Sequence, residues 1–451
     1  MSAFDLALRG GTVVSGTGRA ELDVYVLGER IAALGPRGAP AEARSTLDAS
    51  GCFVLPGMVD THVHLMEPGD PSREDFPTGT AAALRQGVTT IVEHTHSWPV
   101  TSPERYAEKL AHLAGRSHVD FGLAAHVWPD RDDLEALWHA GVVFFKIFTC
   151  STHGVPGLTG ERLAAAFEAI GRFGGSCLVH CEDELLTAGA ENVLRELGRD
   201  DPGILPEWRS REAELAAVHL VGLLSRASGA SVTVAHASSA EVLETIEWHR
   251  RHGAPLVAET CPQYLLLWER EVHEHGALRK FTPPARLRST TDEEAMWAAF
   301  NAGAVHHLST DHAPSTLAQK AAGSIWDVHF GLPGLDTTLP LMLDAALRGR
   351  TSLERVVEAY ASAPARRYGL RRKGRVAPGF DADLVVVDPR ARRVLSDAAV
   401  VSKAGWTPYA GREVVGAVTV TVLRGRVVAR DGELTEEPRG RHLPGPGAPP
   451  R

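Results

Sequence analysis

The chain has 451 residues, a formal net charge of −9, 44% hydrophobic residues and 23% charged residues. This ordinary, acidic composition gives no reason to expect nucleic acid or an anionic membrane surface as a partner. The five cysteines are scattered, odd in number and without a Cys-x-x-Cys pair, which favours a reduced, cytoplasmic protein over a disulfide framework. Neither a membrane span nor a signal peptide is predicted.

Both ends of the chain predict short antiparallel strands. The first strands are expected at 4–8, 11–14, 23–26 and 30–34, separated by glycine-rich turns. Such a unit is too small to bury a core alone, and its candidate partners are similar stretches at 382–388, 416–422 and 425–428. We therefore predict a β-sandwich assembled from residues 1–53 and 369–435. The Pro-, Gly- and Arg-rich tail, 436–451, is expected to be disordered.

Between these ends, apolar strands alternate with amphipathic helical stretches. Strands are predicted at 54–63, 88–93, 121–127, 142–148, 176–180, 231–236, 255–260 and 305–310. Helical segments are expected between them, for example at 103–114, 161–173, 212–228 and 239–252. This alternation over residues 54–368 predicts an α/β fold, a (β/α)8 TIM barrel. A doubly wound open sheet is the alternative, but no Gly-x-Gly-x-x-Gly follows the first strand.

Potential metal ligands stand at the carboxyl ends of these strands, where barrels carry their functional residues. His62 and His64 end the first strand, and residues two apart on a strand point to the same face. His180, His236 and Asp311 occupy corresponding places on later strands. One buried strand-end histidine is usually a hydrogen-bonded core residue. Four of them together with an aspartate favour a site for a divalent metal ion.

Lys146 is the unusual member, because it lies within the apolar stretch 144–148. Burying an unpaired ammonium group is costly. The lysine could form an ion pair with Asp311 or Glu182. Alternatively, burial and nearby cations could depress its pKa, and the neutral amine could react with CO₂ to give N6-carboxylysine, an anionic ligand able to bridge two metals. The residues alone leave both interpretations open.

Several motifs together carry a resemblance to a known family. They are Pro-Gly-Met-Val-Asp-Thr-His-Val-His at 56–64, Phe-Lys-Ile-Phe at 145–148, Val-His-Cys-Glu at 179–182, Ala-His-Ala-Ser-Ser-Ala at 235–240, Ala-Glu-Thr-Cys-Pro-Gln-Tyr-Leu at 258–265 and Thr-Asp-His-Ala-Pro at 310–314. Over nearly its whole length the chain resembles the amidohydrolase superfamily, in its cyclic amidohydrolase branch of allantoinases, dihydropyrimidinases (hydantoinases) and dihydroorotases. It looks closest to the allantoinases.

The resemblance implies a ligand set and a reaction. His62, His64 and Asp311 would bind one divalent metal, His180 and His236 a second, and carboxylated Lys146 would bridge them. The metals would be zinc, with manganese or cobalt as alternatives, and CO₂ would carboxylate the lysine. A metal-bridging hydroxide would open a cyclic amide such as allantoin, a hydantoin or a dihydropyrimidine, with Asp311 transferring the proton. Relatives of this kind imply a homodimer or homotetramer.

Three positions bear on which cyclic amide is the substrate. Met66 stands where dihydroorotases carry an arginine for the substrate carboxylate, and a methionine cannot pair with that group; dihydroorotate is therefore disfavoured. Ser151 stands near the tyrosine position of hydantoinases. His94-Thr95-His96 replaces the Met-Pro and Asn-containing stretch that is usual in allantoinases. These two histidines could contact the substrate or merely pack the loop.

Further substrate contacts follow from the resemblance alone. Backbone groups near Thr282, Phe330 and Gly331 would hold the ring, with Ser151 and His96 as candidate side chains. Other protein classes fit less well. A non-enzymatic collapsin-response-type relative would have lost ligands. A phosphotriesterase-like or deaminase member is a second alternative; deaminases of the superfamily use one metal and lack the carboxylated lysine, so the segments around Lys146 and 283–284 speak against them. A metal-storage module would not explain Asp311, while a different cyclic imide as substrate stays open.

Overall fold

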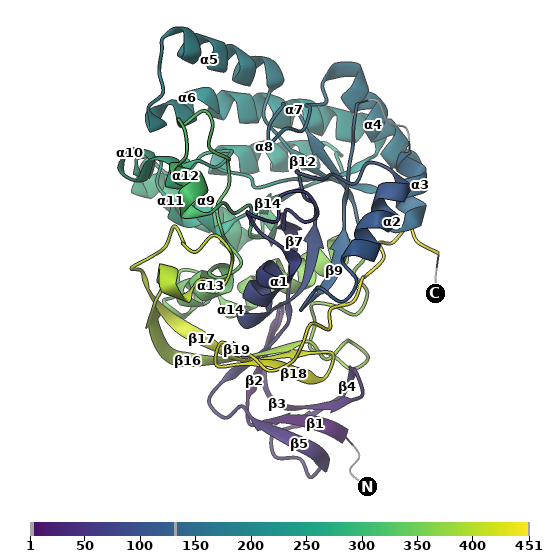
Figure 1. Ribbon diagram of the computed structural model, residues 1–451. Helices are drawn as coiled ribbons and strands as arrows, with labels where there is room; N and C mark the ends of the chain where they lie inside the picture. Colours follow the sequence, from purple (N-terminus) through teal and green to yellow (C-terminus); the bar gives the residue numbers. More distant parts are fainter. Residues whose placement is uncertain (1–3, 130–132, 450–451) are drawn as a thin grey trace.

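The chain is organised by two parallel sheets and one large mixed sheet (Figure 1). The computed structural model describes residues 4–129 and 133–449. Helices follow most strands of the two parallel sheets along the chain. The predicted α/β architecture is therefore confirmed at this level.

The mixed sheet contains strands from both chain ends. Its N-terminal members are β1 Phe4–Arg9, β2 Thr12–Ser15, β3 Gly18–Leu27, β4 Arg30–Pro36, β5 Ala43–Asp48 and β6 Phe53–Pro56; its C-terminal members are β16 Leu384–Val394, β17 Glu413–Leu423, β18 Arg426–Arg430 and β19 Glu433–Leu434. The two groups are joined where β6 pairs antiparallel with β16, with Leu55 opposite Val385. Alternating side chains such as Leu8, Val24 and Leu384 bury one face of the sheet in a shared apolar core.

The first strand predicted for the barrel, 54–63, is two strands that belong to different sheets. β6 ends at Pro56 and β7 begins at Met58. The chain changes sheet at Gly57, whose N–H donates to the carbonyl of Asp383. A side chain at Gly57 would collide with Thr89, so this close crossing requires glycine.

The remaining strands form the two parallel sheets. One contains β7 Met58–Val63, β8 Val88–Glu93 and β9 Asp120–Leu123, and the other contains β10 Ala125–His126, β11 Phe145–Phe148, β12 Ser176–His180, β13 Ser231–Val234, β14 Leu256–Thr260 and β15 Val305–Leu308. Every pairing within them is parallel. Their carboxyl ends therefore face the same way within each sheet.

Several of the helices begin at a residue whose side chain caps the first turn. The described helices are α1 Phe76–Arg85, α2 Pro103–His112, α3 Leu134–Ala140, α4 Gly160–Arg172, α5 Glu184–Glu196, α6 Leu205–Trp208, α7 Arg211–Ser228, α8 Ala240–Arg251, α9 Pro262–Leu266, α10 Glu271–His275, α11 Thr290–Ala302, α12 Leu317–Ala321, α13 Thr338–Leu347, α14 Leu353–Val357 and α15 Ala363–Arg367. Ser102, Ser210 and Ser239 each accept a hydrogen bond from the backbone N–H three residues on, as N-caps do.

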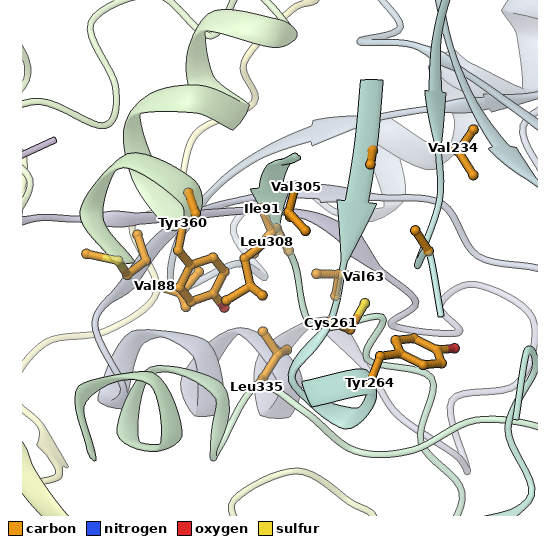
Figure 2. Close-up of a cluster of buried hydrophobic side chains, with 14 of the residues drawn as sticks. Val63, Val88, Ile91, Val234, Cys261, Tyr264, Val305, Leu308, Leu335 and Tyr360 are labelled. Atoms are coloured by element: carbon orange, nitrogen blue, oxygen red, sulfur yellow. The ribbon is translucent and has the colours of Figure 1, made fainter. Parts of the chain in front are cut away.

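The core beneath the parallel strands is largely apolar, and the buried carboxylate of Asp60 links distant parts of the chain there. Figure 2 shows Val63, Ile91, Leu308 and Tyr360 among its side chains. Asp60, in β7, accepts hydrogen bonds from the Tyr360 hydroxyl at 2.8 Å and from the backbone N–H groups of His62 and Thr310. Burial raises the pKa of Asp60 to about 6. These bonds hold β7 against the segment that follows β15.

The C-terminal segment differs from the expected disordered tail. Within 436–449 the backbone N–H groups of Gly440, Leu443 and Gly445 donate to carbonyls of residues 117, 121 and 141 at 2.7–2.8 Å. Composition suggested disorder because the segment has few apolar side chains, but backbone pairing with β9 and α3 orders it regardless of composition. Residues 450–451 lie outside the described residues. In the described chain, no helix has the length and apolar character needed to cross a lipid bilayer.

Candidate metal centre

The six predicted metal ligands come together around the carboxyl ends of the parallel strands: three lie within β7, β11 and β12 (His62, Lys146 and His180), and three follow β7, β13 and β15 (His64, His236 and Asp311). The Nε2 atoms of His62 and His64 lie 3.1 and 3.3 Å from Oδ1 of Asp311. Lys146 Nζ lies 3.2 Å from His62 Nε2. His180 Nδ1 lies 3.0 Å from His236 Nε2. One potential ligand atom of His236 also lies within 4.8 Å of ligand atoms of His62 and Asp311.

The backbone turns sharply where two of these side chains enter the cluster. His236 follows β13 with φ of 37°, and Asp311 follows β15 with φ of 50°. This left-handed conformation is uncommon for residues with a side chain, and such outliers gather at functional sites. Both turns therefore lie at residues whose side chains join the cluster.

The outer nitrogens of three histidines are anchored. His62 Nδ1 lies 2.6 Å from Glu259 Oε1, His64 Nδ1 lies 2.7 Å from the carbonyl of His94, and His180 Nε2 lies 2.7 Å from Glu182 Oε2. A partner on one ring nitrogen orients the ring and keeps the other nitrogen free for a metal. The remaining nitrogen of each ring faces the cluster.

Two buried glutamates anchor His62 and His180. Burial raises the pKa of Glu259, but the rings of His62 and His307 outweigh burial and hold the pKa well below its usual value. Burial likewise opposes ionisation of Glu182, but the neighbouring Arg209 and His180 bring the pKa of this carboxyl to about 2. Nη1 of Arg209 lies 3.3 Å from Oε2 of Glu182. Both groups are therefore carboxylates that accept hydrogen bonds from the ligand rings.

Lys146 has the environment of a reactive amine. Its side chain is 1% exposed, and burial lowers its pKa to about 8. Its Nζ lies 5.0 Å from the ring centre of Phe148 as well as beside His62. Of the two ion-pair partners considered for Lys146, Glu182 is engaged elsewhere, with Arg209, His180 and the hydroxyl of Thr282.

The donor set fits a pair of divalent metals. Four imidazoles, one carboxylate and one amine convertible to a carbamate suit zinc, manganese or cobalt. Burial raises the pKa of Asp311, but the neighbouring His62 and His64 rings dominate and hold it below the usual value, so the carboxylate is ionised as a ligand requires.

The predicted substrate residues lie in varied settings. Ser151 is exposed, and its hydroxyl accepts a hydrogen bond from the N–H of Gly157. The hydroxyl of Thr282 donates to Glu182. The N–H of Gly331 already donates to the carbonyl of Lys280 at 2.9 Å. A substrate would therefore have to bind to other backbone groups near Gly331 than this N–H.

His96 and Phe330 are connected to the predicted metal ligands through ring contacts. The His96 ring centre is 4.0 Å from that of His64 and 4.5 Å from that of His153, with which it stacks. Phe330 in turn packs 5.8 Å from His153. The structure thus brings His96 into the site and connects Phe330 to it through His153.

Three residues of this region were missed from the sequence. Glu259 stood inside a recognised motif without an assigned role. His126 ends a predicted strand, so the strand-end rule that found His180 would have found it too. His153 lies on a loop with φ of 54°, and no sequence pattern singled it out.

Comparisons with known proteins agree with this geometry. The amidohydrolase family matches residues 53–428. An allantoinase from Rubrobacter xylanophilus is 36% identical over 98% of both chains, and an allantoinase from Salmonella newport is 33% identical over 94% of this chain and 95% of its own.

Solved structures of related enzymes share the whole fold. An L-hydantoinase (dihydropyrimidinase) from Arthrobacter aurescens has a TM-score of 0.92, 29% identity, and coverage of 96% of this chain and 98% of its own. A D-hydantoinase (dihydropyrimidinase) from Thermus sp. has a TM-score of 0.91, 26% identity, and coverage of 98% and 99%. The expected resemblance is confirmed, and the chain belongs to the amidohydrolase family.

Proposed function

We propose that the chain hydrolyses a C–N bond of a five-membered cyclic ureide of the allantoin and hydantoin type. The enzyme is a cyclic amidohydrolase, as its allantoinase and hydantoinase relatives indicate over nearly its full length. The observation that carries the proposal is the convergence of four histidines, a lysine and an aspartate on one buried point. The two allantoinase relatives make allantoin the first candidate substrate.

The scaffold proposed for this site is a closed (β/α)8 barrel. At one junction of the two parallel sheets, Val63 forms a parallel bridge with His312, whose carbonyl accepts from the N–H of His64. At the other, the N–H groups of Ala125 and Val143 donate to Phe144 and Leu123. Hydrogen bonds across both junctions support closure, which would place every ligand at the barrel mouth.

The proposed centre holds two divalent metals. His62, His64 and Asp311 would bind one, His180 and His236 the other, and carboxylated Lys146 would bridge them. When bound, such metals lower the pKa of water and polarise a carbonyl group. Glu259 and Glu182 orient His62 and His180 through the hydrogen bonds described above.

Asp311 is the proposed proton carrier. Its carboxylate lies 3.1–3.3 Å from two proposed ligand rings and retains 13% side-chain exposure, so it can both bind and exchange protons. An ionised carboxylate with its pKa held low accepts a proton from water only transiently and passes it to the leaving ring nitrogen. Burial of the surrounding residues excludes bulk water from this transfer.

A substrate panel tests the proposal. Metal-reconstituted enzyme is assayed with allantoin, hydantoin, dihydrouracil, dihydroorotate and a cyclic imide, and ring opening is followed by absorbance and by product identification. We expect the highest kcat/KM for allantoin or hydantoin, and none for dihydroorotate because Met66 is apolar. Activity confined to dihydroorotate or to the imide would overturn the substrate assignment. Hydantoin is the second candidate because the similar solved structures are hydantoinases.

The proposal extends to assembly and location. A homodimer or homotetramer follows from the resemblance to oligomeric relatives, and sedimentation would measure it. All five cysteines are free, and four of them are buried, which supports a reducing, cytoplasmic environment.

A further inference from the structure

A second cluster of histidines lies beside the proposed metal pair. His94 follows β8, His96 lies two residues later, and His126 ends β10. Each side chain offers one ring nitrogen within 4.8 Å of the other two. The cluster therefore spans from the end of β8, which neighbours β7 and its His62 and His64, to the end of β10 in the other parallel sheet.

These three rings are buried and poorly satisfied. His94 and His126 are each 1% exposed and His96 is 8% exposed. Both ring nitrogens of His94, both of His126 and Nε2 of His96 have no hydrogen-bond partner among the described residues. Buried polar atoms are nearly always bonded, so five orphaned nitrogens in one place call for an ion or water.

The surroundings do not explain the cluster by packing alone. The rings contact one another and aromatic neighbours, with ring centres 5.9 Å apart for His96 and His126 and 6.1 Å apart for His94 and His126. Packing would be served equally by apolar side chains, which would leave no orphaned nitrogen. Three neighbouring imidazoles instead provide the ligands of a three-histidine metal site.

We propose that His94, His96 and His126 bind a third divalent metal ion, of the zinc class, beside the proposed pair. Three neutral imidazoles without a carboxylate favour a borderline transition-metal ion over Mg²⁺ or Ca²⁺, which prefer oxygen ligands. Three protein ligands leave a fourth, open position. The site uses none of the six ligands assigned to the pair, but it adjoins them, because His94 also lies within ligand distance of His62 and His64 and His96 is a candidate substrate contact.

Metal counting tests the proposal on the whole protein. Chelator-stripped enzyme is loaded with excess Zn²⁺ and bicarbonate, freed of loose metal by gel filtration and analysed by elemental analysis. We expect three zinc ions per chain, and no third ion when Mg²⁺ replaces Zn²⁺. A count of two at saturating zinc would overturn the third site.

Variants locate the third ion. His126→Gln and His96→Gln should each bind one zinc ion fewer than the unchanged enzyme. The matched control is His249→Gln, which alters a buried histidine that pairs with His219 outside both clusters and should keep three. An unchanged count in both cluster variants would overturn the proposal.

Anomalous scattering at the zinc edge covers the case in which a variant fails to fold, because it uses the unchanged chain. The third peak should lie about 2 Å from nitrogens of all three rings. Water alone between these rings, or a peak shared by His94 and His62, would overturn it. In Lys146→Ala, one ion should persist at this site although the pair is lost, so failure of the pair and failure of the third site are distinguishable.

Discussion

The two histidine clusters at the strand ends differ in how their rings are held. In the proposed pair, His62, His64 and His180 each have one ring nitrogen anchored by a carboxylate or carbonyl. In the second cluster, the rings of His94 and His126 touch other rings but leave both nitrogens unpartnered among the described residues. Anchored rings present a metal with a formed site, whereas unanchored rings must be ordered by the metal itself.

This comparison separates two sources of ligand geometry. At the pair, Glu259, Glu182 and the His94 carbonyl accept hydrogen bonds from three of the four rings and set the direction of those rings before any ion binds. The fourth ring, His236, leaves its Nδ1 unpartnered among the described residues. At the second cluster, aromatic contacts set only the ring planes. The predictions below ask how much the anchoring and the bridging lysine contribute to the pair.

Removing the bridging lysine should have the largest effect. Lys146→Ala should lose both metals of the pair and lower kcat/KM by more than about 10⁴-fold, because metal and proton-transfer catalysis both depend on an intact pair. Elemental analysis and the ring-opening assay measure the two effects. Two metals retained at the pair would contradict the bridge.

The matched control for this change is another buried lysine. Lys320 is 4% exposed, and its Nζ donates to the carbonyls of Lys280 and His329. Lys320→Met should keep the metals of the pair, so that metal loss in Lys146→Ala is not a general result of removing a buried amine.

The next largest effect is expected for the proton carrier. Asp311→Asn keeps an oxygen donor but cannot accept a proton, so kcat should fall by about 10²–10⁴-fold while most metal stays bound. Kinetics and metal content are measured on the same preparation. Full activity in this variant would remove Asp311 from proton transfer.

Loss of an anchor should have an intermediate effect. Glu259→Gln weakens the hydrogen bond to His62 without changing the size of the side chain, and metal affinity or activity should fall by about 10–100-fold. Zinc competition with a chromogenic chelator measures the affinity. An unchanged affinity would mean that the anchoring of His62 does not contribute to metal binding, and that the anchored pair has no advantage over the unanchored second cluster.

The smallest effect concerns the rate at which the pair is assembled. Burial lowers the pKa of Lys146 to about 8, so its neutral fraction rises about tenfold per pH unit below that value and levels off above it. The rate at which stripped enzyme regains activity with zinc, at constant dissolved CO₂, should follow the same curve. A rate independent of pH or of CO₂ would contradict carboxylation of the amine.

Much of the site was predictable because its information is local. The positions of His62, His64, His180 and His236 at or near strand ends follow from short, continuously buried apolar runs, which residue order alone reveals. Most strand ranges agree closely with the structure, but the predicted strand 121–127 is two strands, β9 and β10, which belong to different sheets. The division of the first strand at Gly57 was missed, because it depends on a crossing against Thr89 and Asp383 that the local pattern does not show.

The sequence by itself determined the family, the six candidate ligands and the alternation of strands and helices. Only the tertiary structure decided that Glu259 anchors His62 across 197 positions, that the tail pairs with β9, and that His126 meets His94 and His96. The physical reason is that periodicity and turn chemistry act between neighbours along the chain. Hydrogen bonds and metal geometry act between atoms that only folding brings within a few ångströms.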